Sequence, residues 1–301
     1  MSSFPRSRIT IVSFVVLFGV LTGSRPAAGQ DSIQPLYDGG VSLGDESPGL
    51  GHRFVTDLHT QLTYPFGLAT RDPSRFFLGS LGISALILSD VTTYGALTTP
   101  SFISHERMVG PARTLSRMGD GTSALALMAG FGLVGFVGGS EHEKQTSVML
   151  AEAVATSSVW TGALKFLAGR ERPRDLEEVS SDWTGPASAF DNDRGYVANA
   201  SFPSGHSTGA WAAATILAHQ YPSKHVVPVL AYSTAAAVSY SRMVVGAHWL
   251  SDVVVGGLIG YGCARQVISS RESGDDTHVS RLHFMIDPAG QEKSLGVAVD
   301  F

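Results

Sequence analysis

The chain has 301 residues, of which 44% are hydrophobic and 16% are charged, and its formal net charge is −5 at pH 7. This length allows one domain with a sizeable core, and the charged fraction is low for an ordinary soluble protein. The negative balance and the lack of a basic stripe argue against a nucleic-acid partner. Any phosphate chemistry must therefore use a local cluster of cations.

Residues 1–29 have the pattern of a secretory signal peptide. Two arginines precede an apolar run from Ile9 to about Gly23, and small residues surround a cleavage point before Gln30. An uncleaved membrane anchor is the alternative, although the run is shorter than the about 20 residues of a membrane span. We expect an exported protein of the periplasm or cell envelope. Its single cysteine, Cys263, lies in an apolar segment and is predicted to be a core residue.

Residues 30–75 are rich in Gly, Asp, Ser and Pro and are predicted to be an irregular lead-in that ends in an amphipathic stretch. Residues 76–270 contain uncharged segments rich in Gly and Ala, whose length and lack of strand alternation predict closely packed helices. The predicted helices cover 76–88, 122–139, 145–167, 207–219, 226–239 and 247–264. The sequence therefore predicts an all-α fold in the form of a six-helix bundle.

The C-terminal segment, 271–301, has a different period. Apolar residues alternate in 282–286 and again in 295–301, on either side of an Asp-Pro-Ala-Gly turn. Alternation on both sides of a turn is typical of two paired strands. We therefore predict a short C-terminal β-hairpin that docks on the bundle.

The sequence leaves the relation of the bundle to lipid open. Several predicted helices have only 13 to 18 residues, and Asp90 and Glu152 interrupt the apolar segments. With an exported N-terminus, three membrane-crossing helices would also place the loop after Leu167, which should meet substrate, on the cytoplasmic side. We therefore expect a membrane-associated or soluble envelope protein rather than a fully transmembrane bundle.

Three polar clusters lie at the ends of predicted helices. They comprise Lys165 with Arg170, Arg172 and Arg174; Pro203 with Ser204, Gly205 and His206; and Arg242 with His248 and Asp252. The second cluster precedes a helix, whose first N–H groups and partial positive charge form an anion site. Each cluster alone also has a structural interpretation, because turns and dipole partners use the same residues.

His248 and Asp252 are four residues apart and would share one face of a helix. The carboxylate could then accept the imidazole N–H, which fixes the tautomer and directs the other nitrogen outward as a base or nucleophile. A buried histidine satisfied by a nearby acid is the structural alternative. The presence of the other two clusters favours the chemical interpretation.

Together the clusters resemble the three-part signature of the phosphatidic acid phosphatase type 2 (PAP2) / vanadium haloperoxidase superfamily. The matching positions are Lys165 with Arg172 and Pro173, then 203–206, then Ser241 and Arg242 with His248 and Asp252. The resemblance covers about residues 120–266. It implies a PAP2-type helical phosphatase without metal or cofactor. Its substrate would be a lipid phosphate, such as phosphatidic acid or a prenyl phosphate or diphosphate, or a small phosphomonoester.

The resemblance also implies a role for each site residue. The residues implied to bind phosphate are Lys165, Arg172, Ser204, Gly205 and Arg242. His248 would attack phosphorus to form a phosphohistidine, and Asp252 would orient it. His206 would protonate the leaving oxygen and later activate water, a role typically worth about 10²–10⁴ in rate.

The loop 174–200 contains acidic and aromatic residues and is either a lid over the site or a solvated linker. Two other functions stay open. A vanadate-dependent haloperoxidase could use the same residues with His248 as the vanadium ligand, although the sequence has no recognisable halide site. A non-catalytic envelope scaffold is the other alternative, and the intact catalytic residues argue against it.

Overall fold

The computed structural model describes residues 49–98, 105–175, 182–186, 200–272, 282–285 and 296–299. The predicted signal peptide and most of the 174–200 loop lie outside the described residues. The chain divides into two compact units, Met1–Ile268 and Ser269–Phe301, and each is described by itself.

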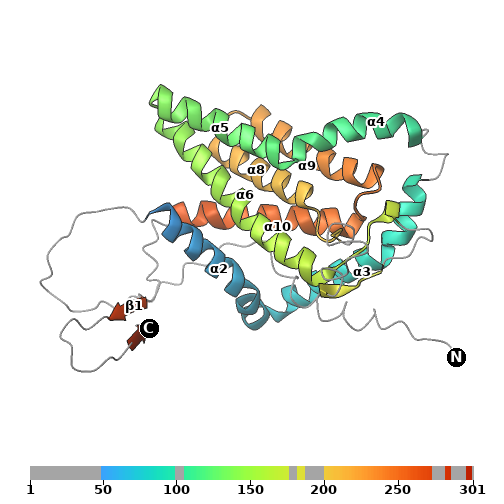
Figure 1. Cartoon of the computed structure of the whole chain (residues 1–301), viewed down its shortest axis with the longest axis horizontal. Coiled ribbons are helices and arrows are strands. Elements are labelled where there is room, and N and C mark those ends of the chain that lie inside the picture. Colours follow the sequence, from blue (N-terminus) through green and yellow to red (C-terminus); the bar gives the residue numbers. More distant parts are fainter. Residues whose placement is uncertain are drawn as a thin grey trace, which may run out of the picture. The chain divides into compact units, whose positions relative to one another are not determined.

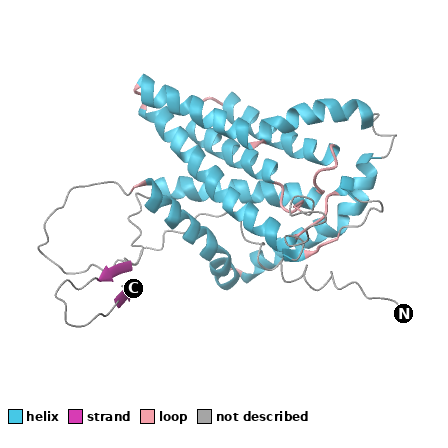
Figure 2. Ribbon diagram, in the orientation of Figure 1, coloured by secondary structure: helices cyan, strands magenta, loops and turns pink. Residues whose placement is uncertain are grey.

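The first unit is helical, which confirms the predicted all-α class (Figures 1 and 2). Its α-helices are α2 (Leu50–Arg71), α3 (Pro73–Thr98), α4 (His105–Ser116), α5 (Gly121–Gly138), α6 (Glu141–Ala168), α8 (Gly205–Gln220), α9 (Val226–Val244) and α10 (Leu250–Glu272). Two short 3-10 turns, η1 (Arg117–Gly119) and η2 (Pro173–Asp175), follow α4 and α6 respectively.

The predicted count of six helices is wrong, because the described part of the chain contains eight α-helices. The additional helices are α2, which lies in the segment predicted to be irregular, and α4. Both carry charged side chains between apolar ones. The helix predictions rested on uncharged segments, whereas an amphipathic helix needs only one apolar face to pack on a core.

Some helices also extend past their predicted bounds. Helix α3, predicted to end at 88, continues through Asp90 to Thr98, and α6 begins at Glu141 rather than at 145. Asp90 does not end its helix because its carboxylate pairs with Arg170 at 2.6 Å, and both side chains are fully buried. A buried charge is tolerated when it is paired and hydrogen-bonded.

Helix α8 packs against α6 and α9. Helix α10 lies very close to the N-terminal turn of α8. A Cβ added at Gly256 would lie 2.5 Å from the Ser204 carbonyl oxygen, and one added at Gly260 would lie 2.1 Å from that of Thr208. Only glycine fits at such distances. Cys263, on the same helix, lies in the apolar core as predicted, and burial raises the pKa of its thiol to about 12.

In the second unit, β1 (Leu282–Met285) and β2 (Gly296–Val299) pair antiparallel, with Leu282 opposite Val299. The turn predicted between them lies outside the described residues. Docking of a hairpin on the bundle stays a prediction.

Candidate active site

The first predicted cluster lies at the C-terminal end of α6 and in the residues that follow it. Lys165 lies in its last turn, and Gly169 ends the helix in the left-handed conformation, φ 54°, which redirects the chain toward Arg172. The Lys165 ammonium donates a hydrogen bond to the Ala200 carbonyl oxygen at 2.5 Å. Burial, with the nearby charges of Arg172 and Arg242, lowers the pKa of Lys165 to about 8 against the opposing effect of Asp252.

The second cluster forms the N-terminus of α8. Ser204 is the N-cap residue, and its hydroxyl oxygen accepts a hydrogen bond from the Ser207 N–H at 3.4 Å, so its own proton stays available to a ligand. Gly205 and His206 are the first two residues of the helix. His206 is half-buried, and burial lowers its pKa to about 4, with Arg242 contributing in the same direction.

His248 is not on a helix, which corrects the prediction that it shares a helical face with Asp252. Helix α10 begins at Leu250, and His248 lies in the loop before it. The two side chains still meet, with Nδ1 of His248 3.6 Å from Oδ2 of Asp252. That same oxygen accepts the backbone N–H of Trp249 at 2.9 Å, an arrangement like half of a capping box. The helix start therefore fixes the carboxylate beside the imidazole.

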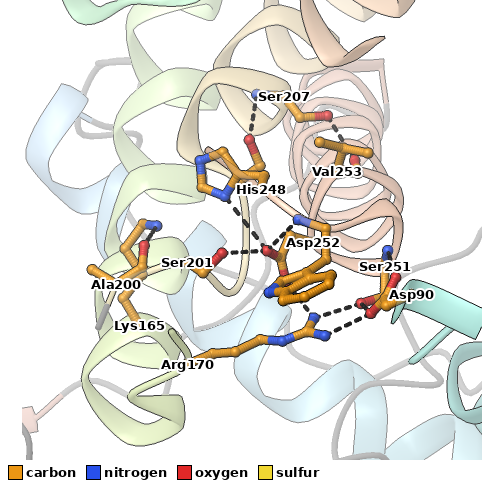
Figure 3. A network of polar contacts seen from close by, with 12 residues as sticks. Asp90, Lys165, Arg170, Ala200, Ser201, Ser207, His248, Ser251, Asp252 and Val253 are labelled. Carbon is orange, nitrogen blue, oxygen red and sulfur yellow. Dashed lines mark hydrogen bonds and ion pairs between the residues drawn. The ribbon is translucent and has the colours of Figure 1, made fainter. Parts of the chain in front are cut away.

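Asp252 is a fully buried hydrogen-bond acceptor for several groups (Figure 3). Its Oδ1 accepts from Arg170 at 2.6 Å, and its Oδ2 accepts from the Ser201 hydroxyl at 2.5 Å. Burial alone would raise the pKa of Asp252, but the Arg170 charge, the adjacent His248 imidazole and the hydrogen bond from Ser201 together lower it. The carboxylate is therefore ionised and can accept the imidazole N–H.

Arg170 belongs to the first cluster, but the sequence indicates no role for it. In the structure it is a partner of Asp252. Its guanidinium is fully buried and bridges Asp252 to Asp90 of α3 (Figure 3). Asp90 in turn accepts from the Ser251 N–H at 2.9 Å and thereby caps the start of α10. The Arg170 guanidinium also lies 4.6 Å from the centre of the Trp183 ring. The spacing of charges in the sequence gives no sign of this network, because Asp90 and Arg170 are 80 residues apart.

Arg242, the cation of the third cluster, lies in the last turn of α9 and is half-buried. It donates a hydrogen bond to the Ser116 hydroxyl, and its Nε is buried without a hydrogen-bond partner. Burial lowers the pKa of Arg242 to about 10, and the charges of Arg172 and Arg174 act in the same direction. This site therefore holds several cations that repel one another and favour an anion among them.

The structure brings the predicted residues together. The charges of Lys165 and Arg242 lower the pKa of both His206 and His248, and Arg172 also lowers that of His206. Within the described ranges, no three His, Cys, Asp or Glu side chains gather as metal ligands would. The arrangement can bind a tetrahedral oxyanion between fixed cations, a helix N-terminus and two histidines.

A buried histidine–aspartate pair beside such a cation cluster is suited to binding a phosphate group. Residues 146–273 match the family model described as the PAP2 superfamily. The match runs from before Lys165 to beyond Asp252, so it spans most of the residues that build the site. The resemblance predicted from the three clusters is confirmed.

An acid phosphatase of Zymomonas mobilis is 32% identical to the chain over 97 residues, which are 29% of this chain and 36% of that protein. The chain thus spans about a third of the length of this curated relative. A structure of LpxE from Aquifex aeolicus covers 60% of this chain and 94% of its own, at 22% identity and a TM-score of 0.46. A transmembrane PAP2 type phosphatidylglycerolphosphate phosphatase from Bacillus subtilis covers 76% and 96%, at 20% identity and a TM-score of 0.45.

Proposed function

We propose that the protein is a metal-independent phosphatase that hydrolyses phosphate monoesters through a phosphohistidine at His248. The observation that supports this most is the buried pair of His248 and Asp252, with Lys165 and Arg242 close enough to act on the imidazole. An anion held by those two cations would be in reach of the histidine. The other predicted phosphate-binding residues stay proposals of the same kind.

In the first step, Nε2 of His248 attacks phosphorus and the bond from phosphorus to the ester oxygen breaks. Burial lowers the pKa of His248 to about 3, so its imidazole is neutral and nucleophilic at neutral pH. Asp252 accepts the Nδ1–H and stabilises the charge that develops on the ring. The 3.6 Å separation of the two atoms would shorten as this charge forms, as catalytic hydrogen bonds often do.

The charge that develops on the phosphoryl oxygens is met by Lys165, Arg172 and Arg242. The backbone N–H of Gly205 and the hydroxyl of Ser204 add hydrogen-bond donors at the start of α8. Fixed donors of this kind stabilise a transition state without reorganising. The positive charges of Lys165, Arg172 and Arg242 can neutralise the phosphate as a divalent ion does in other phosphatases. We therefore infer that no metal is needed.

His206 supplies the proton to the leaving oxygen. With a pKa lowered to about 4 it is neutral in the free protein, so the proton arrives with the substrate as a phosphate monoanion, whose second pKa is about 6. After the alcohol leaves, neutral His206 removes a proton from water as it attacks the phosphohistidine. Inorganic phosphate leaves with the proton that His206 took from water, and both histidines return to their starting forms.

The exposed apolar surface supports membrane association and a lipid substrate. Two described helices, Pro73–Leu97 and Gly121–Gly138, are long and apolar enough to cross a membrane. Their side chains are largely uncovered, as shown by Leu88 at 83% and Val137 at 79% exposure. Large apolar patches of this kind mark contacts with lipid or with other proteins. We therefore propose an envelope protein that contacts the membrane and acts on lipid phosphates.

The test is phosphate release by the purified full chain from a panel of lipid and soluble phosphomonoesters with a metal chelator present. We expect turnover in chelator and inhibition by vanadate, which mimics the five-coordinate state. His248→Ala is the matched control for contaminating activity. Loss of turnover in chelator that a divalent ion restores would contradict the metal-independent mechanism.

A further inference from the structure

Helix α3 has one buried stripe, and this stripe ends beside the loop that carries His248. The residues of the stripe are Ser80, Ile83, Ile87, Asp90 and Tyr94, of which the first four are buried and the last is half-buried. Because they are three or four residues apart, they share one face of the helix. The final two, Asp90 and Tyr94, are the polar members of the stripe that lie nearest to the proposed nucleophile.

Tyr94 contacts the chain on both sides of His248. We call residues 245–249, which connect α9 to α10, the His248 loop. The ring of Tyr94 lies edge-on to the ring of Trp249, with the ring centres 5.6 Å apart, which is a favoured arrangement of aromatic pairs. A Cβ added at Gly246 would lie 3.0 Å from the Tyr94 hydroxyl oxygen. Tyr94 therefore touches the loop two residues before His248 and one residue after it.

The segment that follows α6 contacts the same two loop residues. The Arg174 N–H donates to the Gly246 carbonyl oxygen at 3.0 Å, and the Trp249 indole N–H donates to the Glu171 carbonyl oxygen at 2.9 Å. The added Cβ at Gly246 would also lie 3.0 Å from the Cβ of Arg174, and Gly246 has φ 66°, a conformation that favours glycine. The loop is thus enclosed at Gly246 by Tyr94 and Arg174.

Asp90, one turn before Tyr94, holds the residue at which the loop passes into α10. Its Oδ1 accepts the Ser251 N–H at 2.9 Å, and its Oδ2 accepts the Ser251 hydroxyl at 2.5 Å (Figure 3). Helix α3 therefore fixes the backbone on both sides of His248, with Asp90 after it and Tyr94 around it.

The His248 ring depends on this backbone for its position. Its Nδ1 lies 3.6 Å from the Asp252 carboxylate, which is longer than a hydrogen bond, and it has no other hydrogen-bond partner among the described residues. Residues 246–249 are all buried, so the loop packs on its neighbours instead of on solvent. A shift of the loop would therefore move the imidazole with it.

We propose that Tyr94 is a positioning residue for His248 and acts on it through the backbone of the loop. The inference rests on the proposed function and adds to it a residue outside the range 146–273 that matches the family model. Misplacing a reacting group by about 1 Å can cost about 10²-fold in rate. Lys165 and Arg242 lie on α6 and α9, so a shift of the loop should slow the attack on phosphorus without weakening phosphate binding.

The test is single-turnover release of alcohol from hexyl phosphate and from nitrophenyl phosphate, with the full chain in excess over substrate. Tyr94→Leu should lower the rate constant at saturation about 10- to 100-fold on both esters, because both need the same nucleophile. The protein concentration at half-saturation should change less than about threefold. Tyr94→Phe keeps the ring against Trp249 and should stay within about threefold of the wild type. Phe77→Leu removes a 65% exposed ring from α3 and should change neither quantity.

Three results would overturn the inference. If Tyr94 only stabilises the fold, Tyr94→Leu would need more protein to reach saturation, but its rate constant at saturation would equal that of the wild type. A loss confined to hexyl phosphate would show that Tyr94 acts on proton transfer by His206 instead of on His248. A Tyr94→Phe variant as slow as Tyr94→Leu would show that the ring does not position the loop.

If the wild type hydrolyses neither ester, the proposed function fails, and amide hydrogen exchange decides the inference separately. The N–H groups of Gly246, Ala247, Trp249 and Ser251 are all hydrogen-bonded, so their exchange reports opening of the loop. Peptides that cover 246–251 should exchange at least about tenfold faster in Tyr94→Leu than in the wild type or Phe77→Leu. Equal exchange in the three proteins would refute a positioning role for Tyr94.

Discussion

Arg170 and Arg242 represent two regions of the molecule that treat positive charge differently. Arg170 is fully buried and pairs at 2.6 Å with both Asp90 and Asp252. Arg242 is half-buried and has no carboxylate partner among the described residues, and burial with the nearby Arg172 lowers its pKa to about 10. The first charge is neutralised inside the protein, whereas the second is left for a ligand.

The difference indicates which charges stabilise the fold and which bind a ligand. We call the network of Arg170, Asp90 and Asp252 the paired side, and the cluster of Lys165, Arg242 and His206 the ligand side. Removing one member of a buried ion pair leaves an uncompensated charge, which typically costs about 3–5 kcal/mol. Removing a cation that has no acidic partner relieves repulsion and weakens anion binding instead. His248 interacts with both regions, because it lies beside Asp252 and the charges of Lys165 and Arg242 act on its pKa.

The largest effect that we predict on the ligand side concerns His206. His206→Ala should reduce the initial burst of released alcohol by about 10²–10⁴ for an alkyl phosphate, and much less for nitrophenyl phosphate, because nitrophenolate leaves without a proton. The burst must be measured, since His206 is also the proposed base for the second step and steady-state rates mix the two. A burst depressed equally on both esters would show that His206 is not the acid.

On the paired side, Arg170→Met should lower the free energy of unfolding by about 3–5 kcal/mol, measured by denaturant titration. It should also reduce kcat by about 10²–10³ with little change in KM, because Asp252 would no longer be held beside His248. Without Arg170 the pKa of Asp252 rises, so the acid limb of the kcat/KM profile should move to higher pH.

Two further variants separate positioning from folding. Asp90→Asn added to Arg170→Met should recover part of the stability but not kcat, and Arg170→Lys should retain part of both. If the folded fraction of Arg170→Met keeps the wild-type kcat and pH profile, the role of Arg170 is structural alone.

Arg242→Met provides the opposite pattern. KM should rise about 10- to 100-fold because a charged donor to phosphate is lost. The free energy of unfolding should change by less than about 1 kcal/mol, since the lost bond to Ser116 is offset by relief of an uncompensated buried charge. Destabilisation as large as that of Arg170→Met, with KM unchanged, would erase the distinction between the two regions.

The last prediction concerns the pH dependence of the wild-type protein. His248 and His206 have pKa values lowered to about 3 and about 4, so both are neutral above that range and the proton must come with the substrate monoanion. Raising the pH through about 6 removes that proton, so kcat/KM should fall about tenfold per unit above it. Lys165, with its pKa lowered to about 8, loses its charge above that pH, so KM should rise there. A constant kcat/KM between pH 6 and 8 would be inconsistent with this route for the proton.

The two regions also differ in how far the sequence predicts them. The ligand side is built from helix ends, and local spacing places Lys165, Ser204 and His248 at three of them. Gly and Ala runs correctly predict helices close to these points. The loop position of His248 was missed because four-residue spacing fits either a helix or a capped helix start, and contacts of Asp252 with other segments decide between them.

The paired side could not be predicted, because its contacts join segments far apart in the chain. In the sequence, Asp90 interrupts an apolar segment, and only its contact with Arg170 makes it a buried partner. The sequence does not predict helix α4, because its charged residues resemble a loop, although one of them, Arg113, lines a cavity together with Arg242. Charge in a sequence does not show whether its partner is a side chain or a ligand.

The most direct test of the central claim is to trap the phosphoenzyme in the presence of chelator. Labelled nitrophenyl phosphate, whose leaving group needs no proton, is mixed with the His206→Ala variant, in which the second step should be slow, and the reaction is quenched within one turnover. We predict phosphate bound through an acid-labile, base-stable linkage that maps to His248 and is absent from the His206→Ala/His248→Ala double variant. Phosphate on Ser204, or substrate turnover with no labelled protein at any time, would contradict the mechanism.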